Sequence, residues 1–315
     1  MPHTAAEIME VLARGRNPSS GEYAIRNLQR DWERSQEAAK PFMDFIPIRL
    51  VTIIETSVRE AVVRAVDHGE PYTSRGLSLI AKSPAKAVGD TLLAIKKQRI
   101  TLGHLASFGF PVGRMDEIIG ALTTIFGERF SDELAAARTQ WSEDEDRDLS
   151  PIITNFPGTI GCLDRLFRTR HILVHEQPRE RPYVEEEIAG LFLHSAQFVA
   201  ALKWMLIGRL YGRVPRTQLG MNMQAGQETK EAQAELAALR SGTVEDFADP
   251  KPPLAELEHH WDRYCELSAQ LRAGYLSDMR PGSIAPMVYA TEMTRLTRWR
   301  VEDIKEQRSR PEGVL

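Results

Sequence analysis

The chain has 315 residues, 42% of them hydrophobic and 27% charged, with a formal net charge of −4 at pH 7. This is the composition of an ordinary globular protein, and the length fits two domains or one domain with extensions. The small negative charge excludes no class of partner, because a nucleic-acid binder needs only a local basic patch. The two cysteines, Cys162 and Cys265, exclude a disulfide framework and a zinc site made of cysteines alone, and the low count suits a reducing cytosol.

We expect neither a signal peptide nor a membrane span. The first residues, Met1 to Glu10, have no basic start followed by an apolar core. The most apolar run, Leu191 to Tyr211, contains polar and charged residues that are typical of a buried helix, namely His194, Gln197, Lys203 and Arg209. The sequence therefore predicts a cytoplasmic protein without membrane contact.

Helical patterns begin near the N-terminus. Residues 1–40 predict a helical extension, in which Ser20 caps a helix from Gly21 to Lys40 that ends at Pro41. Pro47 suits the first turn of the next, longer helix. The apolar face of that helix consists of Ile48, Val51, Ile54, Val58 and Val62, and its arginines off this face are Arg49, Arg59 and Arg64.

The middle of the chain predicts shorter helices. Residues 71–150 form a helical insertion punctuated by glycine and proline, and the acidic run from Ser142 to Asp148 predicts a solvated loop. A helix follows Pro157 and continues into the stretch from Arg168 to Glu176. After a break at residues 177–182, a long apolar helix is expected from Tyr183 to Gly212.

The C-terminal third differs in composition, which places a domain boundary near Arg213. Residues 213–253 predict a linker with a polar helix, in which 213–226 are linker and Gln227 to Arg240 are helical. Residues 254–310 predict a separate pair of helices. Because no alternating strand pattern occurs anywhere, we predict an all-α fold, a helical bundle with inserted helices and a C-terminal helical hairpin.

The stretch RTRHILVHE, Arg168 to Glu176, carries the clearest chemistry. Arg170 precedes His175 by five positions, and His171 directly follows the arginine. An arginine is a permanently charged phosphate partner, and a histidine titrates near neutral pH. The pattern of an arginine, four to six residues and then a histidine does not identify a site by itself, because the chain repeats it at Arg165/His171, at Arg168/His175 and at Arg99/His104. We expect the last of these pairs in a loop.

The context of RHILVH, Arg170 to His175, resembles the HEPN superfamily, whose signature is an arginine, a polar residue and a histidine near the start of a late helix. The earlier helix from Arg49 to Glu60 resembles the long first helix of HEPN families related to toxin and defence proteins, and it carries Glu55. The resemblance covers residues 41–212, with the middle helices as an elaboration.

The resemblance implies a metal-independent endoribonuclease that works as a homodimer through this bundle. It implies that His175 is the general acid or base, that Arg170 stabilises the scissile phosphate, and that His171 and Glu55 support the arginine. Residues five apart on a helix are about 140° apart. Arg170 and His175 therefore meet only if the helix begins or bends here, or if they converge across a dimer interface.

Two readings of neighbouring residues stay open. Candidate contacts to RNA phosphates are Arg165, Arg168, Arg179 and Arg181, although nearby carboxylates favour a mixed solvated surface almost equally. His171 and His175 are also spaced as a metal-ligand pair, but the sequence offers no third ligand, so we predict no metal and no cofactor.

The C-terminal segment resembles the LprI-like family, a small helical domain named for periplasmic lysozyme inhibitors. The residues that carry this resemblance are Trp261, Tyr264, Gly282-Ser283-Ile284, Pro286-Met287, Arg295, Thr297 and Arg298. In that family Trp-x2-Tyr starts one helix and Gly-Ser-x2-Pro-Met opens the next. The family's cysteine is absent around residues 290–293, so we expect a cytosolic reuse of the fold for regulation or partner binding, or only a stabilising hairpin.

The sequence thus favours a HEPN-type endoribonuclease acting as a toxin or as a defence effector, with RNA as its substrate and an antitoxin or regulatory protein as a possible partner. A non-catalytic module that binds RNA, a nucleotide or a protein is the alternative. An exported inhibitor of a cell-wall hydrolase is a third reading, carried by the C-terminal resemblance alone.

Overall fold

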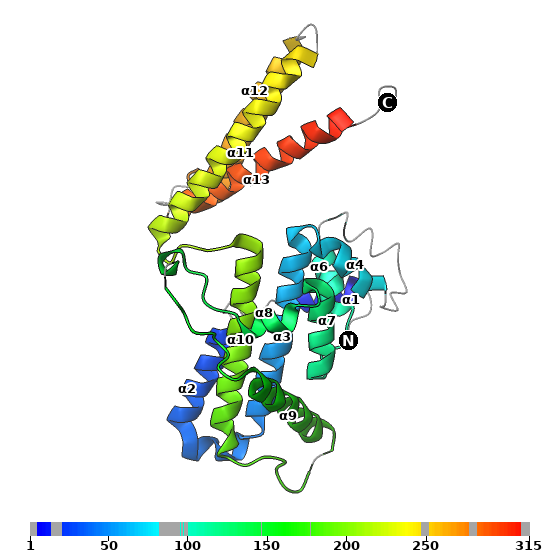
Figure 1. Ribbon diagram of the computed structural model, residues 1–315, viewed down its shortest axis with the longest axis vertical. Coiled ribbons are helices and arrows are strands. Elements are labelled where there is room, and N and C mark those ends of the chain that lie inside the picture. The colour runs from blue at the N-terminus through cyan, green and yellow to red at the C-terminus, as the bar shows by residue number, and fades with distance from the viewer. Residues whose placement is uncertain are drawn as a thin grey trace. The chain divides into compact units, whose positions relative to one another are not determined.

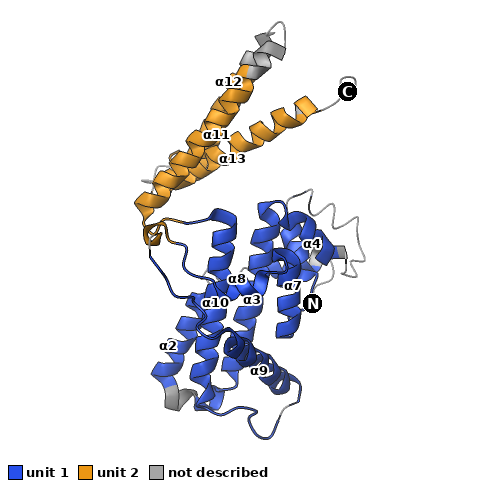
Figure 2. Cartoon of the chain, viewed as in Figure 1, with its two compact units in different colours: residues 1–140, 146–213 blue, residues 141–145, 214–315 orange. Residues whose placement is uncertain are grey.

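The computed structural model describes residues 5–13, 21–81, 95, 97, 100–145, 147–176, 178–246, 252–276 and 282–309. These residues form twelve α-helices and no strand, which confirms the predicted all-α fold (Figure 1). The chain divides into two compact units (Figure 2). Unit 1 comprises residues 1–140 and 146–213, and unit 2 comprises residues 141–145 and 214–315.

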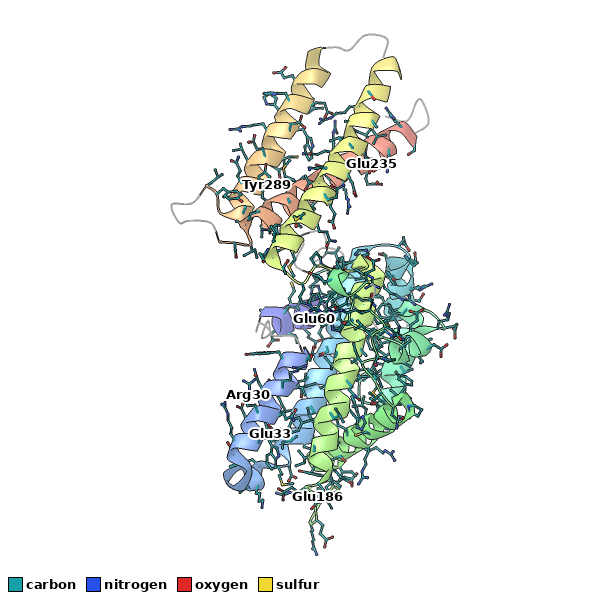
Figure 3. All side chains as sticks on the ribbon, turned by 60° about the vertical axis from the view of Figure 1, so that its left-hand side comes forward. Arg30, Glu33, Glu60, Glu186, Glu235 and Tyr289 are labelled. Carbon is teal, nitrogen blue, oxygen red and sulfur yellow. The ribbon has the colours of Figure 1, made fainter. Side chains whose placement is uncertain are left out.

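Unit 1 contains nine of the described α-helices and one short 3-10 helix, Lys40–Phe42. The helices are α1 (Ala5–Ala13), α2 (Gly21–Ala39), α3 (Phe45–His68), α4 (Tyr72–Ala81), α6 (Leu102–Phe108), α7 (Met115–Phe126), α8 (Phe130–Ala135), α9 (Phe156–His175) and α10 (Glu187–Tyr211). Figure 3 shows Arg30 and Glu33 of α2 on the outer side of this unit.

Helix α3 is the centre of unit 1, because it packs against α2, α4, α6, α7, α9 and α10. The predicted apolar face is its buried face, on which Ile54, Val58 and Val62 are fully covered. The predicted boundaries were close: α3 begins at Phe45, which leaves Pro47 in its first turn, and α2 ends at Ala39. The proposed cap, Ser20, lies outside the described residues.

One arginine of α3 is not where the sequence predicts it. Arg59 is buried, with 8% of its surface exposed, although it falls off the apolar stripe. Its guanidinium donates a hydrogen bond to the carbonyl oxygen of Ser107 and lies over the ring of Phe108, 4.7 Å from the centroid. A buried cation needs such partners, and α6 supplies them through the tertiary fold.

Helix α10 begins at Glu187, four residues later than predicted. The reason lies in Tyr183, whose hydroxyl donates a 2.8 Å hydrogen bond to the Asp44 carboxylate and thereby holds the preceding segment against the start of α3. By length and composition α10 could cross a membrane, but 61% of its most apolar window is buried inside the protein. This agrees with the predicted core helix.

Unit 2 contains three long helices, α11 (Gln218–Asp246), α12 (Pro252–Ala273) and α13 (Ala285–Ser309). The predicted linker at 213–226 was therefore largely wrong, because α11 already begins at Gln218. Packing on α13 overrides the weak helical propensity of this stretch. The Thr229 hydroxyl, for example, hydrogen-bonds the Ala290 carbonyl oxygen (3.0 Å) and the Thr294 hydroxyl (2.9 Å).

The acidic run of the middle segment is not a wholly solvated loop. Asp144 is 4% exposed and accepts a 2.5 Å hydrogen bond from the guanidinium of Arg216, which also lies over the ring of Trp141. The carboxylate of Glu143 accepts the backbone N–H of Arg216 at 2.9 Å. Residues 141–145 consequently belong to unit 2.

A test of the α3–α6 packing uses two glycines. Gly103 donates its backbone N–H to the Asp67 carboxylate at 2.8 Å, and an added Cβ would lie 2.5 Å from the carbonyl oxygen of Val63. We expect Gly103→Ala to lower the free energy of unfolding by about 1–3 kcal/mol. Gly120→Ala, whose Cβ would meet no atom within 4 Å, should raise it by about 0.5–1 kcal/mol. Urea unfolding of the two variants checks both signs, and equal effects would contradict the packing.

Candidate functional site

The Arg–His motif lies in the last two turns of α9, not near the start of a helix as the resemblance implied. The helix begins at Phe156, where the Asn155 side chain accepts the Gly158 backbone N–H at 3.0 Å and Pro157 occupies the first turn. From there α9 continues to His175 without interruption. Of the alternatives that the sequence left open, a helix that begins at the motif does not hold, because the Asn155 cap starts α9 at Phe156.

Arg170 is half-buried on α9, which packs against α3. Glu55 is half-buried on α3 and within electrostatic reach of the Arg170 guanidinium. Burial raises the pKa of the Glu55 carboxyl above its ordinary value, while Arg170 and Arg59 oppose that shift. The packing of α3 against α9 thus places Glu55 and Arg170 in one neighbourhood, without a hydrogen bond or an ion pair between them.

The two motif histidines lie on the exposed side of the end of α9. Their rings are neighbours, with centroids 4.8 Å apart and planes tilted by 49°. Because α9 is continuous, His175 projects about 140° away from Arg170 within one copy of the chain. Between Arg170 and His175, Leu173 packs against the core, whereas the side chain of Val174 is 43% exposed.

The four arginines proposed as phosphate contacts have different surroundings. Arg165 forms a 2.6 Å ion pair with Glu187, and Arg181 pairs with Asp44 at 3.0 Å. Arg179 is exposed, and so is Arg168, whose Nε lies 3.5 Å from the Asp164 carbonyl oxygen. The exposed pair Arg168 and Arg179 is thus the better candidate for contact with an anionic ligand.

Asp44 is a residue that sequence reasoning missed. It accepts hydrogen bonds from both Arg181 and Tyr183, and Arg181 also donates to the Lys40 carbonyl oxygen at 3.2 Å. These bonds hold the segment after the motif against the start of α3. The partners are 137 and 139 positions apart in sequence, so no local pattern predicts them.

The rejected pair Arg99/His104 is not in a simple loop. His104 stands in the first turn of α6, where its ring and the Thr101 side chain cap the helix reciprocally. Arg99 lies outside the described residues. His104 therefore has a local structural role as a helix cap.

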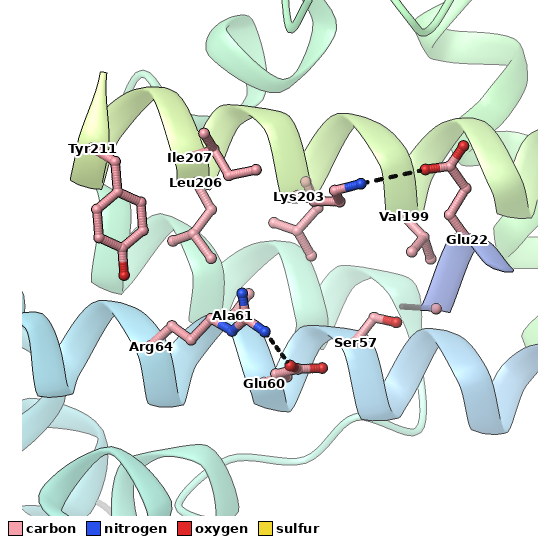
Figure 4. Close-up of a pocket in the computed structure, with 12 residues that line it drawn as sticks. Glu22, Ser57, Glu60, Ala61, Arg64, Val199, Lys203, Leu206, Ile207 and Tyr211 are labelled. Atoms are coloured by element: carbon pink, nitrogen blue, oxygen red, sulfur yellow. Dashed lines mark hydrogen bonds and ion pairs between the residues drawn. The ribbon is translucent and has the colours of Figure 1, made fainter. Parts of the chain in front are cut away.

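Among the described residues, no group of three or more His, Cys, Asp or Glu side chains is arranged to hold a metal ion. A cavity of about 160 Å³ lies between α2, α3 and α10, and none of the predicted site residues lines it. Two ion pairs flank its apolar floor, Lys203 with Glu22 at 3.7 Å and Arg64 with Glu60 at 2.6 Å (Figure 4). Their charges balance, so the cavity favours no class of charged ligand.

Unit 2 has an aromatic surface on α12 and α13. The ring centroid of Trp261 lies 5.1 Å from that of Trp299 and 5.6 Å from that of Tyr264. Trp299 is 60% exposed and Tyr264 is 55% exposed. The Trp-x2-Tyr pair thus lies in the middle of α12 and does not start it, whereas Gly282-Ser283-Ile284 directly precede α13 as predicted.

The contact between α12 and α13 has a buried carboxylate. Glu292 is 5% exposed and accepts hydrogen bonds from Arg295 at 2.7 Å and from the Ser268 hydroxyl of α12 at 3.2 Å. Arg272 of α12 lies 3.6 Å away. The hydrogen bonds from Arg295 lower the pKa of Glu292. Beside this contact, burial raises the pKa of the Cys265 thiol to about 11, so the thiol is neutral at physiological pH.

Comparison with known proteins supports one of the two resemblances. The family model described as lysozyme inhibitor LprI matches residues 214–304, which confirms the resemblance predicted for the C-terminal part. The match covers less than a third of the chain and lies within unit 2. No HEPN family match is found. No curated protein and no solved structure matches the chain.

The lowered pKa of Glu292 predicts acid sensitivity of unit 2. A carboxyl whose folded pKa lies below its unfolded value stabilises the fold above the unfolded pKa, near 4.5, and loses this effect as the pH falls through the folded pKa. Glu292→Gln should therefore destabilise α12 and α13 at pH 7, by about 1–2 kcal/mol, and progressively less below pH 4.5.

The measurement is peptide-resolved hydrogen exchange, taken as the ratio of variant to wild-type rates at each pH. Glu302→Gln is the matched control, because Glu302 lies on the same helix with its side chain 73% exposed. It should change the ratio little at any pH. An effect of Glu292→Gln that persists unchanged into acid would contradict the assignment.

Proposed function

We propose that unit 1 is a HEPN-type, metal-independent endoribonuclease. The observation that carries this proposal is the packing of α3 against α9, which places the half-buried Arg170 within electrostatic reach of the half-buried Glu55, on the helix whose last turns expose His171 and His175. An arginine offers a permanently charged, planar group of donors that matches a phosphate. An exposed imidazole can reach a bound polymer and exchange protons near neutral pH.

In this proposal Arg170 binds the scissile phosphate and stabilises the charge that develops on it. His175 acts as general acid or base on the ribose 2′-hydroxyl or the 5′-leaving oxygen, a role typically worth about 10²–10⁴ in rate. His171, whose ring lies beside that of His175, helps to orient the histidine or the backbone of the RNA. Arg168 and Arg179 are the exposed cations that would contact flanking phosphates.

The continuity of α9 supports a site shared between two copies of the chain. Because Arg170 and His175 project about 140° apart, one copy does not present both groups to the same phosphate. A homodimer through the unit 1 bundle would bring His175 of one copy to Arg170 of the other. We propose that such a dimer acts in the cytoplasm as a toxin or defence effector, restrained by an antitoxin or regulatory protein.

Unit 2 supports a second, separate function. The match to the lysozyme inhibitor family, the exposed Tyr264 and Trp299, and the half-buried Trp261 beside them favour a protein-binding module. Exposed aromatic side chains are enriched where proteins bind one another. We propose that this surface binds a protein partner that regulates unit 1.

The direct test is His175→Ala. Because His175 is exposed, the variant should keep its fold and its oligomeric state while RNA cleavage falls at least about 10²-fold. Cleavage by the wild type should proceed in EDTA and leave 2′,3′-cyclic phosphate ends. His260→Ala is the control, because that imidazole is also exposed and lies in unit 2.

Two outcomes contradict the proposal. One is undiminished cleavage by His175→Ala, and the other is cleavage that depends entirely on an added divalent metal. A wild-type protein that binds RNA without cutting it would favour the non-catalytic alternative.

A further inference from the structure

We infer that unit 2 binds an acidic segment of a partner protein along a strip of aromatic and arginine side chains on α12 and α13. The residues of this basic–aromatic strip are Trp261, Tyr264, Arg272, Arg295, Arg298 and Trp299. The inference rests on the proposed protein-binding role of unit 2 and deepens it, because it states the chemistry of the partner, which is carboxylates next to apolar or aromatic side chains.

One end of the strip offers an apolar contact. The ring centroid of Trp261 lies 5.1 Å from that of Trp299 and 5.6 Å from that of Tyr264, with the planes tilted by 43° and 37°. Trp299 is 60% exposed and Tyr264 is 55% exposed, whereas Trp261 is half-buried. Large rings that are held by a neighbour and still face water lose that water when a partner covers them, which favours binding.

The arginines lie next to these rings. Arg295 stands four positions before Trp299 and three before Arg298, spacings that place side chains on the same side of a helix. Arg272 reaches the strip from α12, because its Nε lies 3.6 Å from the Glu292 carboxylate of α13 that Arg295 also contacts. The side chains of Arg272 and Arg295 are 64% and 57% exposed, so both can meet a ligand.

Glu292 fixes the orientation of these two arginines without using all their donors. The carboxylate is 5% exposed and accepts hydrogen bonds from Nε of Arg295 at 2.9 Å and from Nη2 at 2.7 Å. Nη1 of Arg295 takes no part in this pair. A guanidinium that is held along one edge presents its other edge in a defined direction, which suits a second carboxylate.

The strip carries an excess of positive charge. Its three arginines share one carboxylate, that of Glu292, and the exposed Glu302 further along α13 is paired with Lys305 at 3.2 Å. Arg240 and Arg300 are matched differently, because these two arginines contact three carboxylates, those of Glu258, Asp262 and Asp303. An acidic ligand therefore complements the strip, and a basic ligand would meet like charge.

A protein segment fits the strip better than single-stranded RNA. Stacked bases need open ring faces that follow one another along a strand. Here the three rings contact one another at one end of the strip, and the arginines lie beside them. Clustered Trp, Tyr and Arg side chains are typical of the central contacts of protein interfaces. RNA binding is accordingly the competing outcome of the experiment.

The experiment selects ligands for the full-length protein from a display library of random peptides. Peptides of about twelve residues can cover the strip, which extends roughly 16 Å along α12 between positions 261 and 272. Wild type and Trp299→Ala are separate targets, and only peptides that require Trp299 are analysed. We expect these peptides to contain more Asp and Glu than Lys and Arg, together with aliphatic or aromatic residues.

The affinity of one selected peptide, labelled with fluorescein, then tests the role of charge. Arg298→Glu reverses an exposed charge, so the fold should survive and binding should weaken at least about tenfold. Lys230→Glu is the matched control, because Lys230 is an exposed cation on α11 outside the strip. It should leave the affinity unchanged.

Three outcomes would overturn the inference. If the Trp299-dependent peptides are neutral or basic, unit 2 is still a protein-binding module and only the acidic chemistry is wrong. If no peptide depends on Trp299, the protein-binding role of this surface fails and the inference fails with it. If labelled oligouridine binds more tightly than the selected peptide and Trp299→Ala abolishes that binding, the strip is a nucleic-acid surface. None of these results depends on RNA cleavage by unit 1.

Discussion

The burial of α3 along nearly its whole length is the constraint on which unit 1 depends. Six helices pack around it, so every polar side chain that it carries inward must find a partner in another helix. Arg59 finds the carbonyl oxygen and aromatic ring of α6, and Glu55 lies within electrostatic reach of Arg170 on α9. The same burial that stabilises the bundle therefore fixes the position of the candidate site and raises the pKa of its carboxyl.

The geometry of α9 determines how that site must work. Helix α9 packs against α3 with Arg170 half-buried and leaves His175 exposed at its end, about 140° around the helix. The proposed twofold arrangement would present the exposed histidine of one copy to the arginine of the other. In that proposal the motif supplies two halves of a site shared between copies.

Much of this was predictable from periodicity and end signals. The apolar spacing of α3, the Pro157 start of α9 and the helix that opens at Ala285 follow rules that act within one or two turns. The buried Arg59, the Asp44–Tyr183 hydrogen bond and the early start of α11 depend on partners far away in sequence. Local propensity carries no information about such partners, which is why these features were missed or predicted wrongly.

Mixing two inactive variants tests the shared site most directly. The Arg170→Ala and His175→Ala proteins are each expected to be inactive alone. Unfolding and refolding the two together forms mixed dimers, each with one complete site. The account predicts recovery of about a quarter of wild-type RNA cleavage, because half of the dimers are mixed and each holds one intact site of two. A mixture that forms mixed dimers and stays inactive would contradict a site shared between copies.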